Sequence, residues 1–278
     1  MKYKLIAIDL DGTLLTDDKR ITAESISVLK EIIKRGYEIV IATGRRYWSA
    51  KKFVESIDEN ICILANNGNI VRNMKDDKIL IKKYLNVEDF NVLIKEGKKE
   101  GLDPIIHVDN YEDGYDMVIE LDRNNSKYSS YLSDNVDRFR RVDDLLKMDN
   151  PKVLTVVYIG DKEKLEFFNN KILENYPYKY SSHMMENMTI AGALLEVMNP
   201  LGSKWLSLEE YGKVKDIKDY EMIAIGDDNN DIEMIKKAGL GIAMKNGTPK
   251  VKKAADIVTT KSNNENGVTS ILKEVLNI

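Results

Sequence analysis

The fold is decided by the stretch Leu5-Ile6-Ala7-Ile8-Asp9-Leu10-Asp11-Gly12-Thr13, which joins an apolar run to two closely spaced carboxylates. Four consecutive apolar residues are typical of a strand that is buried on both faces of a parallel sheet. Ligands of open α/β sheets bind beyond the carboxyl ends of such strands, where Asp9 and Asp11 stand. Residues at i and i+2 of an extended chain point to the same side. The stretch therefore predicts a central strand that delivers two carboxylates to one site.

Apolar runs of the same kind recur towards both ends of the chain. They cover residues 39–42, 61–65, 222–225, 240–244 and 257–258. Between the first two strands, Ile26, Leu29 and Ile33 have helical spacing, and Gly36 stands where a C-terminal cap belongs. This alternation of strands and helices predicts a doubly wound, Rossmann-like α/β core with a parallel sheet.

The middle of the chain has a different pattern. From about residue 84, Phe90, Leu93 and Ile94 mark a helix, residues 153–159 form a β-branched run, 162–175 are helical, and 194–198 form another strand. We interpret 84–198 as an α+β domain inserted between the third and fourth predicted strands of the core. The core would then consist of residues 1–83 and 199–278.

Two short polar motifs lie at predicted junctions of the core. Thr43-Gly44-Arg45 follows the second strand, where a hydroxyl and backbone N–H groups can cradle a phosphate. Lys204 begins a predicted helix, although a cation there opposes the helix dipole. Such a lysine could hold a phosphate or neutralise a carboxylate. Taken alone, the first motif could be a plain turn and the lysine a solvated side chain.

A third polar motif, Gly226-Asp227-Asp228-Asn229-Asn230-Asp231, lies between a predicted strand and a helix. Three carboxylates in five positions repel one another unless a cation is nearby. Hard oxygen ligands of this kind suit Mg²⁺. The structural alternative is an Asx-rich turn that caps the helix.

The combination of motifs resembles the haloacid dehalogenase (HAD) superfamily, and within it the Cof-type, sugar-phosphatase-like group (subfamily IIB) that carries a large C2-type inserted cap. Residues 9–15 match the first motif of the family, 43–45 the second, Lys204 the third, and 226–231 the fourth. Asn67-Gly68 and the segment 241–246 also resemble the group. One residue departs from the pattern, because Trp205 stands where the group usually has glycine.

The resemblance implies a role for each matched residue. Asp9 would attack phosphorus and form an aspartyl-phosphate, and Asp11 would act as general acid and base. A catalytic Mg²⁺ would be held by Asp9, the backbone carbonyl of Asp11 and Asp227. Phosphate oxygens would be bound by Thr43, Gly44 and Lys204, the last of which also counts as catalytic. Asn230 and Asp231 would support the site from behind its direct ligands, and the insert would cover it and select the leaving group.

Composition sets the class of partner that we expect. The chain has 42 Lys and Arg against 46 Asp and Glu, mixed along its length, which argues against a nucleic-acid-binding surface. Cys62 is the single cysteine and excludes an internal disulfide; its apolar surroundings predict a buried thiol. No run is long enough for a signal peptide or a membrane span, so we expect a cytoplasmic protein. The family resemblance implies that its substrate is a small phosphorylated metabolite. The oligomeric state is not predicted.

Two other functions fit part of this pattern. A sugar phosphomutase of the same superfamily would use the same residues but would hand the phosphoryl group back to the sugar by way of a bisphosphorylated sugar, without releasing phosphate. A receiver-type signalling module also combines acidic groups, a hydroxyl and a lysine. However, such modules place the phosphoacceptor on a different strand from the acidic pair, and they lack a large insert.

Overall fold

The computed structural model describes residues 2–121, 128, 131–132, 138–188 and 192–278, which form two compact units. The first unit comprises Met1–Lys82 with Ser203–Ile278, and the second comprises Lys83–Gly202. The predicted role of the second unit, a cap over the site, stays a prediction.

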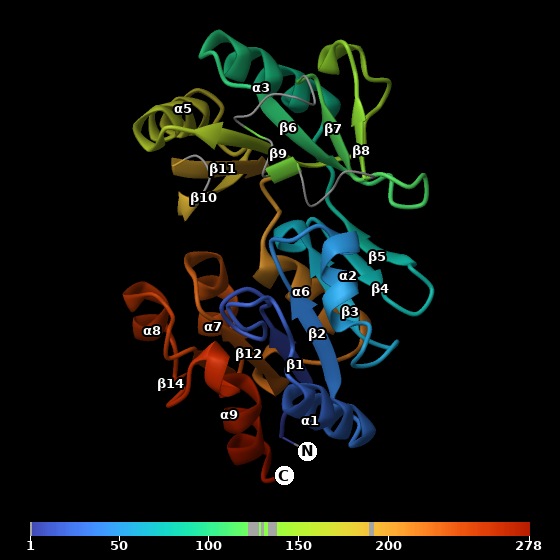
Figure 1. Cartoon of the computed structure of the whole chain (residues 1–278), viewed down its shortest axis with the longest axis vertical. Helices are drawn as coiled ribbons and strands as arrows, with labels where there is room; N and C mark the ends of the chain where they lie inside the picture. The colour runs from blue at the N-terminus through green and yellow to red at the C-terminus, as the bar shows by residue number, and fades with distance from the viewer. Residues whose placement is uncertain (1, 122–127, 129–130, 133–137, 189–191) are drawn as a thin grey trace. The chain divides into compact units, whose positions relative to one another are not determined.

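The first unit is built on an eight-stranded sheet with the order β14-β13-β12-β1-β2-β3-β4-β5 (Figure 1). The strands are β1 (Leu5–Ile8), β2 (Glu38–Ala42), β3 (Cys62–Ala65), β4 (Ile70–Asn73), β5 (Ile79–Lys82), β12 (Met222–Gly226), β13 (Leu240–Ala243) and β14 (Ile257–Val258). The six strands from β14 to β3 are parallel, and β1 lies between β12 and β2. The predicted doubly wound core is thus confirmed.

Helices cover both faces of this sheet. They are α1 (Ala23–Lys34), α2 (Tyr47–Val54), α6 (Lys204–Val214), α7 (Ile232–Lys237), α8 (Pro249–Ala254) and α9 (Gly267–Leu276), with short 3₁₀ turns η1 (Asn66–Gly68), η3 (Asp219–Glu221), η4 (Asn229–Asp231) and η5 (Asn263–Glu265). On one face, Trp205 and Leu208 of α6 and Met234 of α7 pack against alternate residues of the central strands, and the buried, free Cys62 belongs to this cluster. The intervening strand residues, such as Ile6 and Ile8, are equally buried, because strand side chains alternate between faces.

The sequence analysis missed the antiparallel hairpin β3–β4 and the edge strand β5. Ala65 pairs with Ile70 across the hairpin, and β4 pairs in turn with β5. The insert therefore follows β5, not the third strand as predicted. β5 is easily missed because only Ile81 of its four residues is buried.

The second unit contains a six-stranded sheet with the order β10-β11-β9-β6-β7-β8. The elements are α3 (Val87–Lys99), β6 (Pro104–Val108), β7 (Met117–Ile119), β8 (Phe139–Arg141), η2 (Leu145–Lys147), β9 (Val153–Gly160), α5 (Lys162–Asn175), β10 (Ser181–Met188) and β11 (Gly192–Met198). Phe90 and Leu93 of α3 and Phe168 of α5 pack in one cluster with strand residues of this sheet. The expected helices and strands of this segment are present.

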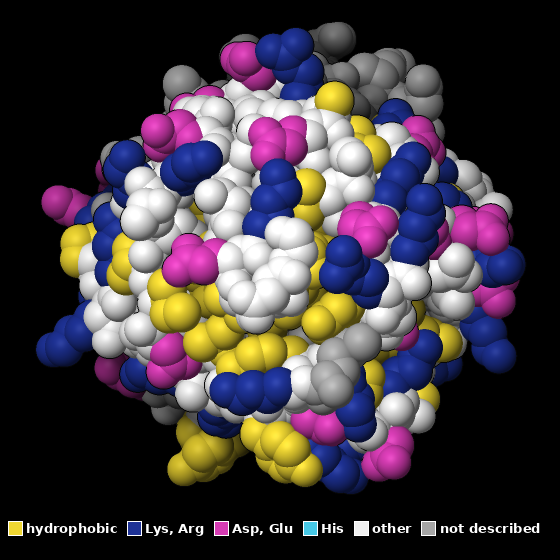
Figure 2. Space-filling view, turned by 90° about the horizontal axis from the view of Figure 1, so that it is seen from below, with side chains coloured by type: hydrophobic (Ala, Val, Ile, Leu, Met, Phe, Trp, Pro, Cys, Tyr) yellow, Lys and Arg dark blue, Asp and Glu magenta, His cyan; other side chains and the backbone are white. Residues whose placement is uncertain are grey.

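Surface charge agrees with the mixed composition. The face in Figure 2 carries Lys and Arg side chains interspersed with Asp and Glu, together with exposed hydrophobic groups. In the parts of the chain that are described, no helix has the length and apolar character of a membrane span.

Candidate active site

The predicted motifs meet at the carboxyl edge of the central strands. Asp9 directly follows β1, Thr43 follows β2 and Asp227 follows β12, three strands that are neighbours in the sheet. Because parallel strands end at the same edge, the three side chains lie together. Lys204, the first residue of α6, reaches this edge from outside the sheet.

Lys204 is the centre of the buried charge cluster. Its Nζ donates to Oδ1 of Asp9 and to Oδ1 of Asp231, each at 2.7 Å, and the three side chains are between 1 and 8% exposed. Burial lowers the pKa of Lys204, but the carboxylates of Asp231 and Asp9 raise it by more than burial lowers it. The pKa of Lys204 therefore lies above its ordinary value. The ammonium group therefore stays charged.

The carboxylates nevertheless outnumber the ammonium. One oxygen each of Asp9, Asp227 and Asp231 lies within 4.8 Å of the others. Burial raises the pKa of Asp9 well above its usual range; Lys204 opposes this shift, and the nearby Asp231 and Asp227 add to it. Burial and the charge of Asp231 also raise the pKa of Asp227 to about 7. An excess of buried negative charge with hard oxygen donors fits a divalent cation.

Asp231 and Asp227 have different surroundings. Oδ1 of Asp231 accepts from Lys204, and its Oδ2 accepts from the N–H groups of Asp227 and Asp228 at 3.0 and 3.1 Å. Both oxygens of Asp231 are therefore engaged in holding the loop and the lysine. Oδ1 of Asp227 accepts a hydrogen bond from Oγ1 of Thr13 at 2.8 Å. This contact was not predicted, although Thr13 belongs to the first motif.

Gly12 allows the close approach of Asp227. A Cβ at position 12 would lie 2.3 Å from Oδ2 of Asp227, and the residue has a φ of +77°. Both the left-handed backbone and the missing side chain are required here. The glycine thus brings the loop after β1 into contact with the loop after β12.

The loop after β2 exposes a backbone donor. Thr43 is buried, and its Oγ1 accepts from the N–H of Arg45 at 3.1 Å. Within the described ranges, no protein group accepts a hydrogen bond from the N–H of Gly44. Asn230, from η4, donates through Nδ2 to Oδ1 of Asn67 at 3.0 Å. The structure thus brings every predicted motif to this edge of the sheet.

The comparisons identify the family of this arrangement. A family model described as haloacid dehalogenase-like hydrolase matches residues 6–272. The chain belongs to the haloacid dehalogenase-like hydrolases. It is 29% identical to the Bacillus subtilis protein named "Putative phosphatase YxeH", over 99% of this chain and 98% of the relative. The resemblance of the motifs to this superfamily and the prediction of a hydrolase are confirmed.

Two further comparisons extend along the whole chain. A second Bacillus subtilis relative, the 5-amino-6-(5-phospho-D-ribitylamino)uracil phosphatase YitU, is 26% identical over 100% of this chain and 99% of its own. The crystal structure of a haloacid dehalogenase-like hydrolase from Bacteroides thetaiotaomicron has a TM-score of 0.83 and 28% identity, covering 99% of this chain and 100% of the other. The likeness therefore includes the inserted unit.

In this haloacid dehalogenase-like hydrolase, Asp11 is not part of the buried cluster. Arg45 donates to both of its oxygens, from Nε at 2.6 Å and Nη2 at 2.7 Å, and Lys19 donates to Oδ1 at 2.7 Å. Burial raises the pKa of Asp11, but Arg45 and then Lys19 outweigh it and lower the pKa to about 2. The carboxylate is ionised here. The sequence contained Arg45 within a motif but gave no sign of Lys19, an exposed residue on a loop.

The departure at Trp205 is explained by packing. Lys204 points to the charge cluster, whereas Trp205 is 2% exposed and lies in the apolar cluster under α6. Successive helical residues point about 100° apart, so the two side chains do not compete. Replacing glycine with tryptophan here fills the core and leaves Lys204 in its contacts.

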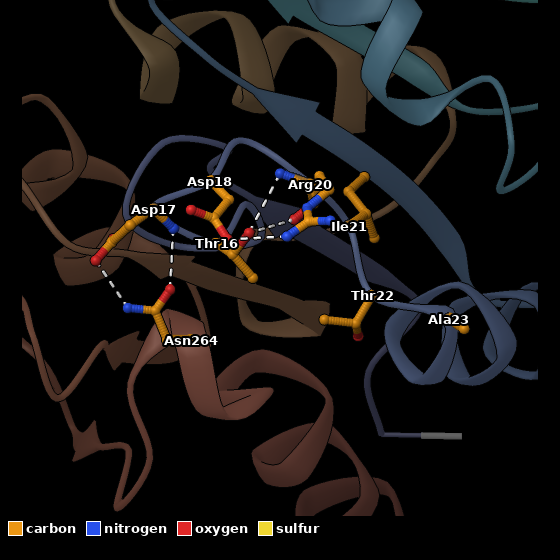
Figure 3. Close-up of a pocket in the computed structure, with 8 residues that line it drawn as sticks. All are labelled: Thr16, Asp17, Asp18, Arg20, Ile21, Thr22, Ala23 and Asn264. Atoms are coloured by element: carbon orange, nitrogen blue, oxygen red, sulfur yellow. Dashed lines mark hydrogen bonds and ion pairs between the residues drawn. The ribbon is translucent and has the colours of Figure 1, made fainter.

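The hydrolase also has a pocket of about 650 Å³ on the loop that follows the first motif (Figure 3). Its lining residues are Thr16, Asp17, Asp18, Arg20, Ile21, Thr22, Ala23 and Asn264. Several of their polar groups are paired with one another: Asn264 accepts from the N–H of Asp17 and donates to its carboxylate, and Arg20 donates to Asp18 at 2.9 Å. The predicted site residues do not line this pocket, and the convergent carboxylates are the better candidate.

Proposed function

We propose that this hydrolase is a Mg²⁺-dependent phosphatase that forms an aspartyl-phosphate on Asp9. The observation that carries the proposal is the buried contact of Asp9 with Lys204, beside Asp227, in a cluster with excess negative charge. Mg²⁺ would be held by Asp9, Asp227 and the Asp11 carbonyl. When bound, it supplies positive charge that offsets the repulsion between a carboxylate and a phosphate.

The remaining steps follow from the side chains. Oδ2 of Asp9 would attack phosphorus, because Oδ1 accepts from Lys204. Lys204 and the Gly44 N–H would bind the phosphoryl oxygens and stabilise the charge spread over them in the transition state. Thr43 would line the same cradle. Asp231 and Asn230 would hold Lys204 and the loops in place.

Asp11 would serve both proton transfers. In its ionised form it can take the proton from the water that hydrolyses the aspartyl-phosphate. To protonate the leaving alcohol it must first carry a proton, which requires its pairs with Arg45 and Lys19 to loosen. We propose that a bound phosphate ester competes for these two cations and so releases Asp11.

The substrate class follows from the relatives. YitU is named for a phosphate ester on a ribityl chain. We infer that this hydrolase acts on phosphate monoesters of small sugars, sugar alcohols or cofactors that carry them, and that residues 84–198 select among these alcohols.

The test is phosphate release from a panel of esters in Mg²⁺, comparing the wild type with Asp9→Asn. The panel contains p-nitrophenyl phosphate, hexose and pentose phosphates, pyridoxal phosphate and flavin mononucleotide. Asp18→Asn is the matched control, because Asp18 is an exposed aspartate on the neighbouring loop. Release by the wild type and the control, and none by Asp9→Asn, supports the proposal. Transfer to a second hydroxyl of a sugar phosphate without release of phosphate would favour a mutase.

A further inference from the structure

The loop that joins β3 to β4 has an unusual backbone. Asn66, Asn67 and Gly68 have φ values of 49°, 54° and 87°, and all three residues are buried. Most residues avoid a left-handed conformation because their Cβ crowds the backbone, and asparagine tolerates it better than most. Hairpin loops are often built with asparagine and glycine in left-handed conformations, and this loop follows that preference. It does not explain the side chain of Asn67.

This hairpin loop is tied to the proposed phosphate cradle. The N–H of Asn66 donates to the carbonyl oxygen of Arg45, and the N–H of Asn67 donates to that of Thr43, both at 2.9 Å. The side chain of Asn67 lies over Gly44, since a Cβ on this glycine would be 3.4 Å from Oδ1 and 3.5 Å from Nδ2 of Asn67. The amide of Asn67 therefore packs on Gly44, the residue whose N–H is proposed to bind phosphate.

The same loop contacts the other two motifs. Oδ1 of Asn67 accepts from Nδ2 of Asn230 at 3.0 Å. The carbonyl oxygen of Gly68 accepts from Ser207 at 2.6 Å, and a Cβ on Gly68 would be 2.5 Å from the carbonyl oxygen of Ser203, the cap of the helix that begins with Lys204. One buried turn thus touches the loops that carry Gly44, Lys204 and Asn230.

We propose that Asn67 is a positioning residue for phosphoryl transfer, whose side-chain amide fixes Gly44 against Asn230 while the hairpin around it supports the start of α6. The inference rests on the proposed phosphatase function. Groups that must match the transition state lose effect when they move by small distances. Asn67 therefore contributes to kcat more than to substrate binding.

The experiment compares Asn67→Gly with Asn277→Gly. Glycine adopts the left-handed backbone of this loop without strain and removes the side chain with its amide. Asn277 has a φ of 54° at the end of α9, so its replacement makes the same change away from the motifs. Steady-state kinetics with p-nitrophenyl phosphate in Mg²⁺, inhibition by inorganic phosphate and the melting temperature are measured for each.

For Asn67→Gly we expect kcat to fall by about 10-fold, with KM and the inhibition constant of phosphate within about twofold of the wild type. Asn277→Gly keeps the wild-type kcat. A kcat of Asn67→Gly within twofold of the wild type overturns the inference, as does a loss of kcat that only follows a loss of folded protein. If the wild type itself releases no phosphate from the ester panel, the proposed function fails instead, and the two failures are distinguishable.

Discussion

Replacing Lys204 with methionine tests the charge cluster most directly. The substitution keeps the length of the side chain and removes an ammonium group that bonds two carboxylates at 2.7 Å. Asp9 and Asp231 then face each other and Asp227 without a compensating charge. Removing one partner of a buried ion pair costs about 3–5 kcal/mol, because the remaining charge is left buried and unpaired. For a unit of this size the loss corresponds to a decrease in melting temperature of about 10 °C.

The assay is urea unfolding followed by tryptophan fluorescence in EDTA at pH 7. Trp48 and Trp205 are the two tryptophans of the chain, and both belong to the first unit, so the signal reports on that unit. Lys213→Met is the matched control, since this lysine lies on the same helix and is 70% exposed. The control should change the free energy of unfolding by less than about 0.5 kcal/mol.

A double variant isolates the charge effect. Asp9→Asn added to Lys204→Met removes one of the carboxylates left unpaired, so it should restore about 1–3 kcal/mol of the loss. Mg²⁺ should also stabilise Lys204→Met more than the wild type, because it supplies the missing positive charge. A loss below about 1 kcal/mol for Lys204→Met, or strictly additive losses in the double variant, would refute the reasoning.

Three further predictions concern the neighbours of this cluster. Because the folded-state pKa of Asp227, about 7, lies above its unfolded value, the metal-free first unit should lose stability as pH rises from about 4 to about 7. Mg²⁺ should therefore raise the melting temperature more at pH 8 than at pH 5, and equal effects at the two pH values would contradict this. Because the pKa of Asp11 is lowered to about 2, its pairs stabilise the fold above about pH 4 and are lost as pH falls towards 2. Urea midpoints of Arg45→Gln and the wild type should differ at pH 7 and converge near pH 2, whereas a constant difference would argue against this pairing. Thr13→Val removes the hydroxyl that donates to Asp227, so it should lower kcat/KM by about 10-fold and raise the Mg²⁺ concentration needed for half-maximal rate. Thr13→Ser is the control, because serine keeps the hydroxyl.

The sequence was sufficient for the parallel part of the fold because its strands are buried on both faces. The four residues of β1 are all buried, and so are the four of β3, which is why uninterrupted apolar runs marked them. The hairpin was missed although Asn67-Gly68 between apolar segments is a strong hairpin signal. In the sequence, Asn67-Gly68 was interpreted only as part of the family resemblance and not as a turn.

Side-chain contacts were harder to predict than the motifs. Lys204 could be recognised from the sequence because a cation at the start of a helix opposes the helix dipole. The structure shows that it donates hydrogen bonds to two carboxylates. The pairing of Lys19 with Asp11 depends on a loop conformation that no local pattern encodes. Thr13 and Asp227 are 214 residues apart, so their contact exists only once β1 and β12 are neighbours.

The two ends of the inserted unit are joined by a hydrogen bond. Nδ2 of Asn199 donates to the carbonyl oxygen of Tyr84 at 2.8 Å, so the beginning and end of this segment meet within the unit itself. Bringing together the ends of a flexible chain of about 115 residues costs on the order of 4 kcal/mol in loop-closure entropy. A folded insert with adjoining ends removes this cost from the rest of the chain. Under the proposed function, in which the insert selects the leaving group, this closure would let an insert of another length or specificity replace the present one while the flanking strands still pair.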